Sequence, residues 1–311
     1  MMIGAAVSDL DPDYFANLER AYATGADILE LQPELWSWPP TRAPQRIRWL
    51  AVHAPSQGRD IASPDEEFRR FSVDETKRGM LFAADIGANV YLLHPGQIYD
   101  PANAGPRTVQ PDYPYVTNYF FQQPQDRALM ERALDVSIDE LFVFNQVRRF
   151  GFRFTLENLP FPNLGATIGE IERVHLSLAA RYGLGLTLDI PHLWLSYHRL
   201  LANPYLQASV PGFPSDPAGF YDELKGFLDR HGDQVVYYHL HGVTTNEEHL
   251  AVMNKGTYPR EELDLCRVME IIGLEKPIIA EVFNAPPEAK AQSVRNLEHI
   301  AATCSLSPPP P

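Results

Sequence analysis

Carboxylates and imidazoles recur at the ends of short hydrophobic runs along this sequence. The runs and their polar residues are VHAP with His53, LLHPG with His94, TLENLP with Glu157, TLDIPH with Asp189 and His192, YYHLHG with His239 and His241, and IIAEVF with Glu281. An earlier run, ILELQPE, carries Glu30 and Glu34. These residue types bind divalent ions, and two or three carboxylates with one imidazole suit Mn, Zn or Mg. The pattern therefore predicts a metal site.

Repetition along the chain is what supports this prediction. Four successive runs end in a candidate ligand: Glu157, Asp189, His239 and Glu281. One such acid alone is more often a solvated charge, but four in succession favour a shared site. His53 and His94 stand where their strands turn outward, and His192 follows in LDIPH, so all three are further candidates. Glu247 and His249 in TTNEEHLAV lie two residues apart, on one side of an extended chain, although a solvated acidic loop is the better explanation of that pair taken alone.

The hydrophobic runs are of strand length and rich in Val, Ile, Leu, Tyr and Phe. The predicted strands are 2–8, 26–32, 46–54, 88–94, 153–159, 184–190, 235–243 and 277–283. Segments with helical periodicity separate most of them, which predicts an α/β protein with a parallel sheet. Eight such units predict closure into a single (β/α)8 barrel over 1–305, with its active site at the C-terminal ends of the strands. The Pro-rich end, 306–311, is predicted to be a disordered tail.

Two predicted loops, after strands four and six, are much longer than usual: 95–125 and 193–216. Both follow strands that end in candidate ligands, so they belong to the active face of the barrel. Loops of this length commonly act as lids or binding loops. The candidate substrate contacts are Tyr113, Tyr115 and Tyr119 of the first loop, together with His241. Packing of the loop aromatics on one another explains their abundance about as well.

The charge balance disfavours a protein that binds polyanions without sequence preference. The chain of 311 residues has 26 Lys and Arg against 40 Asp and Glu, a formal net charge of -14. Phosphate backbones are held mainly by Lys and Arg, so we expect no stable nucleic-acid binding. Metal ligands contribute part of the acidity, so the charge alone does not exclude a nucleic-acid substrate.

The cysteines and the N-terminal sequence indicate in which cellular compartment the protein is expected. Cys266 and Cys304 lack CxxC spacing and lie in amphipathic stretches, so neither a disulfide nor a thiolate zinc site is expected. The N-terminal MMIGAAVSDLD lacks the features of a signal peptide, and the chain has no run of ~18 apolar residues. A cytoplasmic protein that does not associate with membranes is the expectation, while the oligomeric state is left open.

The ordered set of motifs resembles a known family. HPG, EN, LDIPH, HLHG, a later acid-x-His and IIAE follow one another as in xylose-isomerase-like TIM barrels, specifically the endonuclease IV-like branch (AP endonuclease family 2). The resemblance implies up to three ions. Their ligands would be His53, His94 and Glu157 for one, Glu157, Asp189, His239 and Glu281 for another, and His192, Glu247 and His249 for a third. Glu247 stands where Asp is usual, and His241 is an addition that could act as a ligand, a substrate contact or a donor to a ligand.

Within that family, ENLPFP, LDIPHLWL and HLHGV with EEHL are most similar to cobamide-remodelling phosphodiesterases. The leading hypothesis is therefore metal-dependent hydrolysis of a phosphodiester in a bulky small molecule, such as the nucleotide loop of a corrinoid, with two or three Zn or Mn ions. Glu157 would bridge two ions, Glu281 or Glu157 would orient the attacking water, and His192 would help hold the ion that stabilises the leaving oxygen.

Three alternatives remain at this stage. A sugar isomerase or epimerase would use one Mn or Mg and two glutamates that move a proton, and it would not need His53, His94, His192, Glu247 and His249 together. A DNA-repair AP endonuclease would share the ligands, but the acidic composition and the lack of an evident basic groove count against it. A barrel that acts only as a binding module would leave the acids and imidazoles at the strand ends unexplained.

Overall fold

The computed structural model describes most of the chain outside the long connections. The described residues are 2–8, 28–33, 47–56, 59–96, 126–161, 163–202, 219–245, 247–253, 255, 259, 262–282 and 285–304. Several predictions fall outside these ranges: the candidate contacts Tyr113, Tyr115 and Tyr119, nearly all of the 95–125 loop, and the 306–311 tail. The predicted ligands all lie within them.

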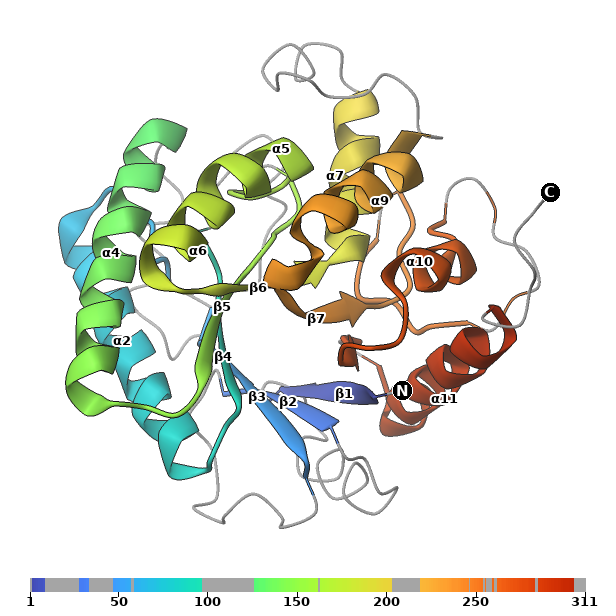
Figure 1. Cartoon of the computed structure of the whole chain (residues 1–311), viewed down its shortest axis with the longest axis horizontal. Coiled ribbons are helices and arrows are strands. Elements are labelled where there is room, and N and C mark those ends of the chain that lie inside the picture. The colour runs from blue at the N-terminus through green and yellow to red at the C-terminus, as the bar shows by residue number, and fades with distance from the viewer. Residues whose placement is uncertain are drawn as a thin grey trace.

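Eight parallel strands form a closed barrel in which each strand pairs with its neighbours in sequence. They are β1 (Ile3–Ser8), β2 (Ile28–Gln32), β3 (Trp49–His53), β4 (Val90–Leu93), β5 (Arg153–Glu157), β6 (Gly185–Asp189), β7 (Val235–Leu240) and β8 (Ile278–Ala280). The barrel closes where β1 pairs with β8, with Ile3 opposite Ile278. Figure 1 shows the labelled strands in the centre of the molecule, with helices outside them. All eight predicted strands are confirmed, and the single (β/α)8 barrel with them.

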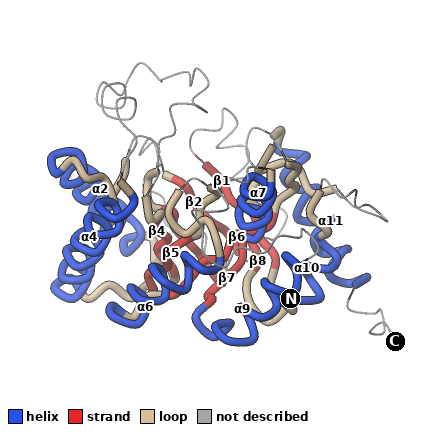
Figure 2. Tube along the Cα trace, turned by 90° about the horizontal axis from the view of Figure 1, so that it is seen from above, coloured by secondary structure: helices blue, strands red, loops and turns tan. Residues whose placement is uncertain are grey.

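Helices surround the strands, as Figure 2 shows from above. They are α2 (Glu66–Asp85), α4 (Arg127–Arg148), α5 (Ile168–Glu170), a π-helical turn (Ile171–His175), α6 (Leu176–Tyr182), α7 (Ile190–Leu201), α9 (Gly219–His231), a 3-10 turn (Gly232–Gln234), α10 (Leu265–Ile272) and α11 (Pro287–Cys304). Asp65, Asp126 and Asp264 begin α2, α4 and α10, and each accepts hydrogen bonds from N–H groups of the first turn. None of the helices in the described ranges combines the length and apolar content that crossing a bilayer requires.

Alternation along the strands separates the barrel interior from the packing against the helices. Tyr237 and His239 of β7 face inward, whereas Tyr238 and Leu240 join the apolar cluster that contacts the outer helices. The interior apolar cluster consists of Ala6, Ile28, Ala51, Val90, Leu92, Tyr237 and Ile279. This packed interior lies below the strand ends, so it provides a rigid base for the predicted ligands.

The segment after β6 differs from the prediction. Residues 193–201 belong to helix α7 and not to a long loop. Asp189 accepts a hydrogen bond from the backbone N–H of His192 as the N-cap, and Pro191 lies in the first turn, where its missing N–H costs nothing. The apolar run LWL, read from the sequence as loop, is buried against the barrel. The remaining residues of the predicted loop, 203–216, lie outside the described ranges.

The expectation of unpaired cysteines was wrong. Cys266 in α10 and Cys304 at the end of α11 form a disulfide, with their Cα atoms 5.7 Å apart. Helices α10 and α11 pack side by side, so residues 38 positions apart in sequence come together. Sequence spacing alone could not reveal this pairing, because it depends on the packing of two helices on the barrel.

Reduction of the Cys266–Cys304 disulfide should lower the free energy of unfolding by about 3–4 kcal/mol, because the bond restricts the unfolded chain over a 38-residue separation. Urea unfolding with and without a phosphine reductant measures the difference. The matched control is the Cys266→Ser, Cys304→Ser double variant, which should not respond to reductant. An equal midpoint for the oxidised and reduced wild-type protein would contradict the expectation.

Candidate metal centre

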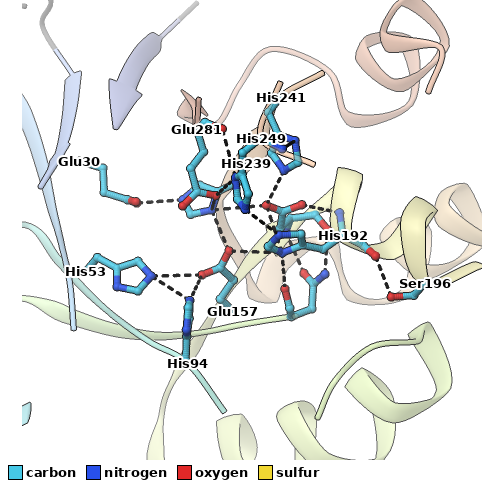
Figure 3. Close-up of polar contacts among 12 residues, drawn as sticks. Glu30, His53, His94, Glu157, His192, Ser196, His239, His241, His249 and Glu281 are labelled. Atoms are coloured by element: carbon cyan, nitrogen blue, oxygen red, sulfur yellow. Dashed lines mark hydrogen bonds and ion pairs between the residues drawn. The ribbon is translucent and has the colours of Figure 1, made fainter. Parts of the chain in front are cut away.

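The predicted ligands other than Glu247 converge at one mouth of the barrel, at the carboxyl ends of the strands (Figure 3). Within the described residues, three groups of side chains bring their ligand atoms within 4.8 Å of one another. The groups are His53, His94 and Glu157; Glu157, Asp189, His239 and Glu281; and His192, His241 and His249. We call them the first, central and third groups. The first and central groups consist entirely of predicted ligands, whereas the third differs by one residue.

In the first group, the two imidazoles meet one oxygen of Glu157. The Nε2 atoms of His53 and His94 lie 2.9 Å apart, and they lie 3.6 Å and 3.1 Å from Glu157 Oε2. His53 Nδ1 donates to the Ala54 carbonyl, which turns Nε2 toward the mouth. Burial would lower the pKa of His53, but the hydrogen bond and charge of Glu157 outweigh it and raise this pKa to about 9. Burial and the nearby His53 lower the pKa of His94.

The central group contains three buried carboxylates and one imidazole. His239 Nδ1 lies 2.9 Å from Glu157 Oε1, 3.1 Å from Glu281 Oε2 and 3.8 Å from Asp189 Oδ2. Burial alone would raise the pKa of Glu157 and of Glu281, because it disfavours their charged forms. The charge and hydrogen bonds of His239 outweigh burial, so the pKa of each carboxyl is lowered. For Asp189, burial dominates and raises the pKa well above the usual range.

Unsatisfied oxygens in the central group fit a divalent ion. Asp189 Oδ2 and Glu281 Oε2 are buried and accept no hydrogen bond from any residue in the described part of the chain. Buried carboxylate oxygens normally have hydrogen-bond partners, because leaving them without one costs stability. Asp189 Oδ2 also lies 3.4 Å from both His192 Nδ1 and His241 Nε2. A cation among these atoms would satisfy the oxygens and reduce the repulsion between the carboxylates.

Glu30 and Gln32 of β2 orient the central group, and the sequence analysis did not assign them a role. Glu30 Oε2 lies 2.9 Å from His239 Nε2 and accepts a hydrogen bond from the Tyr237 hydroxyl at 2.6 Å. The Glu30 contact leaves His239 Nδ1 facing the carboxylates, which is the arrangement that supports metal-bound histidines. Gln32 donates to Glu281 Oε1 at 2.7 Å. The signal available in the sequence was Glu30 itself, a charged residue between two leucines of a predicted strand.

Asn158 fixes the position of Asp189. Its side chain accepts from the Asp189 backbone N–H at 2.8 Å and donates to the Asp189 carbonyl at 2.7 Å. The Asn158 carbonyl lies 3.2 Å from His192 Nδ1. The EN dipeptide after β5 therefore supplies a ligand, Glu157, and a residue that holds the next strand end in place.

The third group contains His241 in place of Glu247, the residue that the family resemblance implied. Glu247 is exposed, and its backbone forms a tight turn with Thr244. His249 has a left-handed backbone, with φ of 56°. The expected extended chain would place Glu247 and His249 on one side, but the turn and the left-handed residue remove that relation. Glu248 is the more enclosed acid: burial would raise its pKa, but His192, His249 and Arg199 outweigh it and lower the pKa.

The family follows from a match along most of the chain. A family model described as a xylose isomerase-like TIM barrel matches residues 42–302. The chain belongs to this family. The membership confirms the resemblance inferred from the motifs, and it agrees with the closed barrel and the ligands at the strand ends. No curated protein matches the chain in sequence.

Solved structures with the same fold differ in activity. A D-tagatose 3-epimerase-like protein matches with a TM-score of 0.65 and 18% identity, over 98% of each chain. Endonuclease IV from Thermus thermophilus matches with a TM-score of 0.60 and 18% identity, over 97% of this chain and 100% of the other. Another Thermus thermophilus protein, soaked with ZnCl2, matches with a TM-score of 0.60 and 17% identity, over 97% and 99%. At these identities the likeness shows the fold alone.

Replacement of Glu30 by Gln should weaken binding of a divalent ion to the central group by about 10- to 100-fold, because His239 loses its carboxylate partner while the buried volume is kept. Competition with a fluorescent chelator measures the affinity, and Glu67→Gln on the exposed face of α2 is the matched control. Equal affinities for the Glu30→Gln variant and the wild-type protein would show that Glu30 does not support the ligand.

Proposed function

We propose that this protein is a metal-dependent phosphodiester hydrolase that acts on a bulky small molecule containing a nucleotide. The observation that carries the proposal is the shared position of Glu157 between two groups of ligands, with a third group beside them. Hydrolases of phosphate esters commonly hold two ions a short distance apart, one on each side of the reacting phosphate. A reaction that needs one ion does not require this many ligands.

Glu157 has the geometry of a bridging ligand. Its Oε2 lies 3.1 Å from His94 Nε2, whereas its Oε1 lies 2.9 Å from His239 Nδ1. The two oxygens of one carboxylate thus face two different groups. When bound, divalent ions at these groups supply stabilisation of the negative charge that a phosphodiester develops during hydrolysis.

Glu281 is the residue that we assign to the attacking water. Its Oε1 is held by Gln32, and its Oε2, which accepts no hydrogen bond within the described ranges, lies 3.1 Å from His239 Nδ1. A carboxylate held on one oxygen can orient a water with the other and accept its proton. His192 and His249 lie with their Nε2 atoms 3.3 Å apart, and we assign them to the side of the leaving oxygen (Figure 3).

The substrate we propose is the nucleotide loop of a cobamide. The Cys266–Cys304 disulfide argues against the reducing cytoplasm that was expected from the cysteines. The motifs ENLPFP, LDIPHLWL and HLHGV support this substrate through their similarity to cobamide-remodelling phosphodiesterases. The formal charge of -14 also favours a small molecule over duplex DNA, because few basic residues are available to neutralise a phosphate backbone.

An epimerase of a keto sugar is the second candidate. Glu157 Oε1 and Glu281 Oε2 both approach His239 Nδ1, at 2.9 Å and 3.1 Å, so two glutamates flank one ligand as proton transfer on both sides of a carbon requires. The fold of the D-tagatose 3-epimerase-like protein is compatible with this reading. The first group distinguishes the hydrolase from the epimerase, because an epimerase with one ion does not need His53 and His94.

The metal-loaded protein should contain at least two divalent ions per chain and hydrolyse a cobamide phosphodiester. His94→Ala should remove one ion and lower the hydrolysis rate by about 100-fold or more, because it opens the first group. Elemental analysis and mass spectrometry of the products measure the two effects. The matched control is His299→Ala on the exposed face of α11, which should change neither.

Three outcomes would contradict the hydrolase. They are one ion or none in metal-replete protein, interconversion of a keto sugar that survives His53→Ala and His94→Ala, and efficient cleavage of abasic DNA at physiological salt. The second outcome would support the epimerase, and the third a DNA-repair nuclease. Glu157→Gln should abolish hydrolysis, since this residue is assigned to both ions.

A further inference from the structure

The third group differs in chemistry from the other two. Its members, His192, His241 and His249, are all imidazoles, whereas the first group includes one carboxylate and the central group three. We propose that the third group is a three-histidine site, with His241 as its ligand in place of Glu247, that selects zinc-like ions over Mn and Mg. The inference concerns the ion-binding part of the proposed hydrolase, and its test measures metal content and not hydrolysis.

The ring positions support a shared ion. The Nε2 atoms of His192 and His249 lie 3.3 Å apart. The His241 ring stacks on the His249 ring with centroids 4.4 Å apart, and it lies edge-on to the His192 ring at 5.6 Å. His241 Nε2 is buried and has no hydrogen-bond partner within the described residues. Three imidazoles therefore surround one point at the mouth (Figure 3).

Backbone carbonyls orient the rings of His192 and His249. His192 Nδ1 lies 3.2 Å from the Asn158 carbonyl, and His249 Nδ1 lies 3.3 Å from the Glu281 carbonyl. A ring that donates from Nδ1 leaves the Nε2 lone pair for a ligand bond, and such contacts of the second nitrogen are typical of metal-bound histidines. Two Nε2 lone pairs at 3.3 Å repel each other unless a cation or a proton lies between them.

His241 has two contacts at Nδ1 that require opposite tautomers. The atom lies 3.0 Å from the Gly242 carbonyl and 2.9 Å from the backbone N–H of His249. Donation to the carbonyl leaves Nε2 free to bind an ion, whereas acceptance from the N–H places the proton on Nε2, toward Asp189 Oδ2 at 3.4 Å. An ion in the third group would select the first tautomer, so its binding has a spectroscopic signature on this ring.

The ligand types set the selectivity. Imidazoles suit Zn, Cu, Fe and Ni, while Mg and Mn favour carboxylate, carbonyl and water oxygens. A site of three neutral imidazoles also leaves the full positive charge on the ion, whereas a carboxylate at position 247 would have neutralised part of it. The third group should therefore discriminate against Mn and Mg more strongly than the central group does.

The test is equilibration of the wild-type protein with equal Zn and Mn, followed by crystallography with anomalous scattering at both absorption edges. We expect zinc at the third group at least tenfold in excess of manganese. Equal occupancy by manganese would overturn the selectivity.

The ¹⁵N chemical shifts of His241 give a second test. On zinc binding they should change from those of the Nε2-protonated ring to those of the Nδ1-protonated ring. Unchanged shifts at full zinc loading would overturn the assignment of His241 as a ligand.

Two variants with matched chemistry complete the test. His241→Gln should lose one zinc per chain by elemental analysis, whereas Glu247→Gln should keep the wild-type count. Circular dichroism and thermal unfolding show whether both variants are folded. If His241→Gln does not fold, the anomalous-scattering and ¹⁵N measurements on the wild-type protein still test the proposal. Loss of the ion in Glu247→Gln together with its retention in His241→Gln would overturn the proposal, and so would loss of the ion only in Glu248→Gln. None of these results depends on cobamide hydrolysis.

Discussion

The placement of three carboxylates inside one barrel mouth is the constraint on which the site depends. Glu157, Asp189 and Glu281 are all buried, and after burial itself the charges of Glu281 and Glu157 contribute to the raised pKa of Asp189. Burying like charges together is costly unless cations compensate them. The imidazoles around them, and the ions they are suited to hold, supply that compensation. Rigid strands are therefore needed to keep these charges in place against their own repulsion.

The repeated strand pattern made most of the fold, and most of the residues that gather at the barrel mouth, predictable from the sequence. Each β strand is mainly apolar, and a polar residue stands at its last position or directly after it, so the strand and the candidate ligand are visible in the same short run. His53, His94, Glu157 and Asp189 could be found in this way because closure of a parallel barrel brings all strand ends to one face. The same logic explains why the predicted extents of the strands were close to the observed ones.

The features that sequence reasoning missed depend on contacts between distant segments. Glu30 acts through His239, which is 209 positions away, and the disulfide depends on the packing of α10 against α11. Glu247 was assigned as a ligand from the family resemblance, and its spacing from His249 in an extended chain agreed with that assignment. The left-handed backbone at His249 removes the spacing argument. Function could not be predicted to the same extent, because a D-tagatose 3-epimerase-like protein and endonuclease IV share this fold, so the fold alone does not decide the reaction.

The hydrogen bond between Tyr237 and Glu30 connects the barrel interior to the chemistry above it. Tyr237 packs edge-on against Trp49, with ring centroids 4.9 Å apart, while its hydroxyl contacts the carboxylate that orients His239. A phenylalanine at position 237 would fill almost the same volume but remove one of the two donors to Glu30 Oε2, leaving only His239 Nε2 at that oxygen. A substitution in the barrel interior is thus not neutral for the groups at the mouth, because the same tyrosine packs the interior and holds the carboxylate that orients His239.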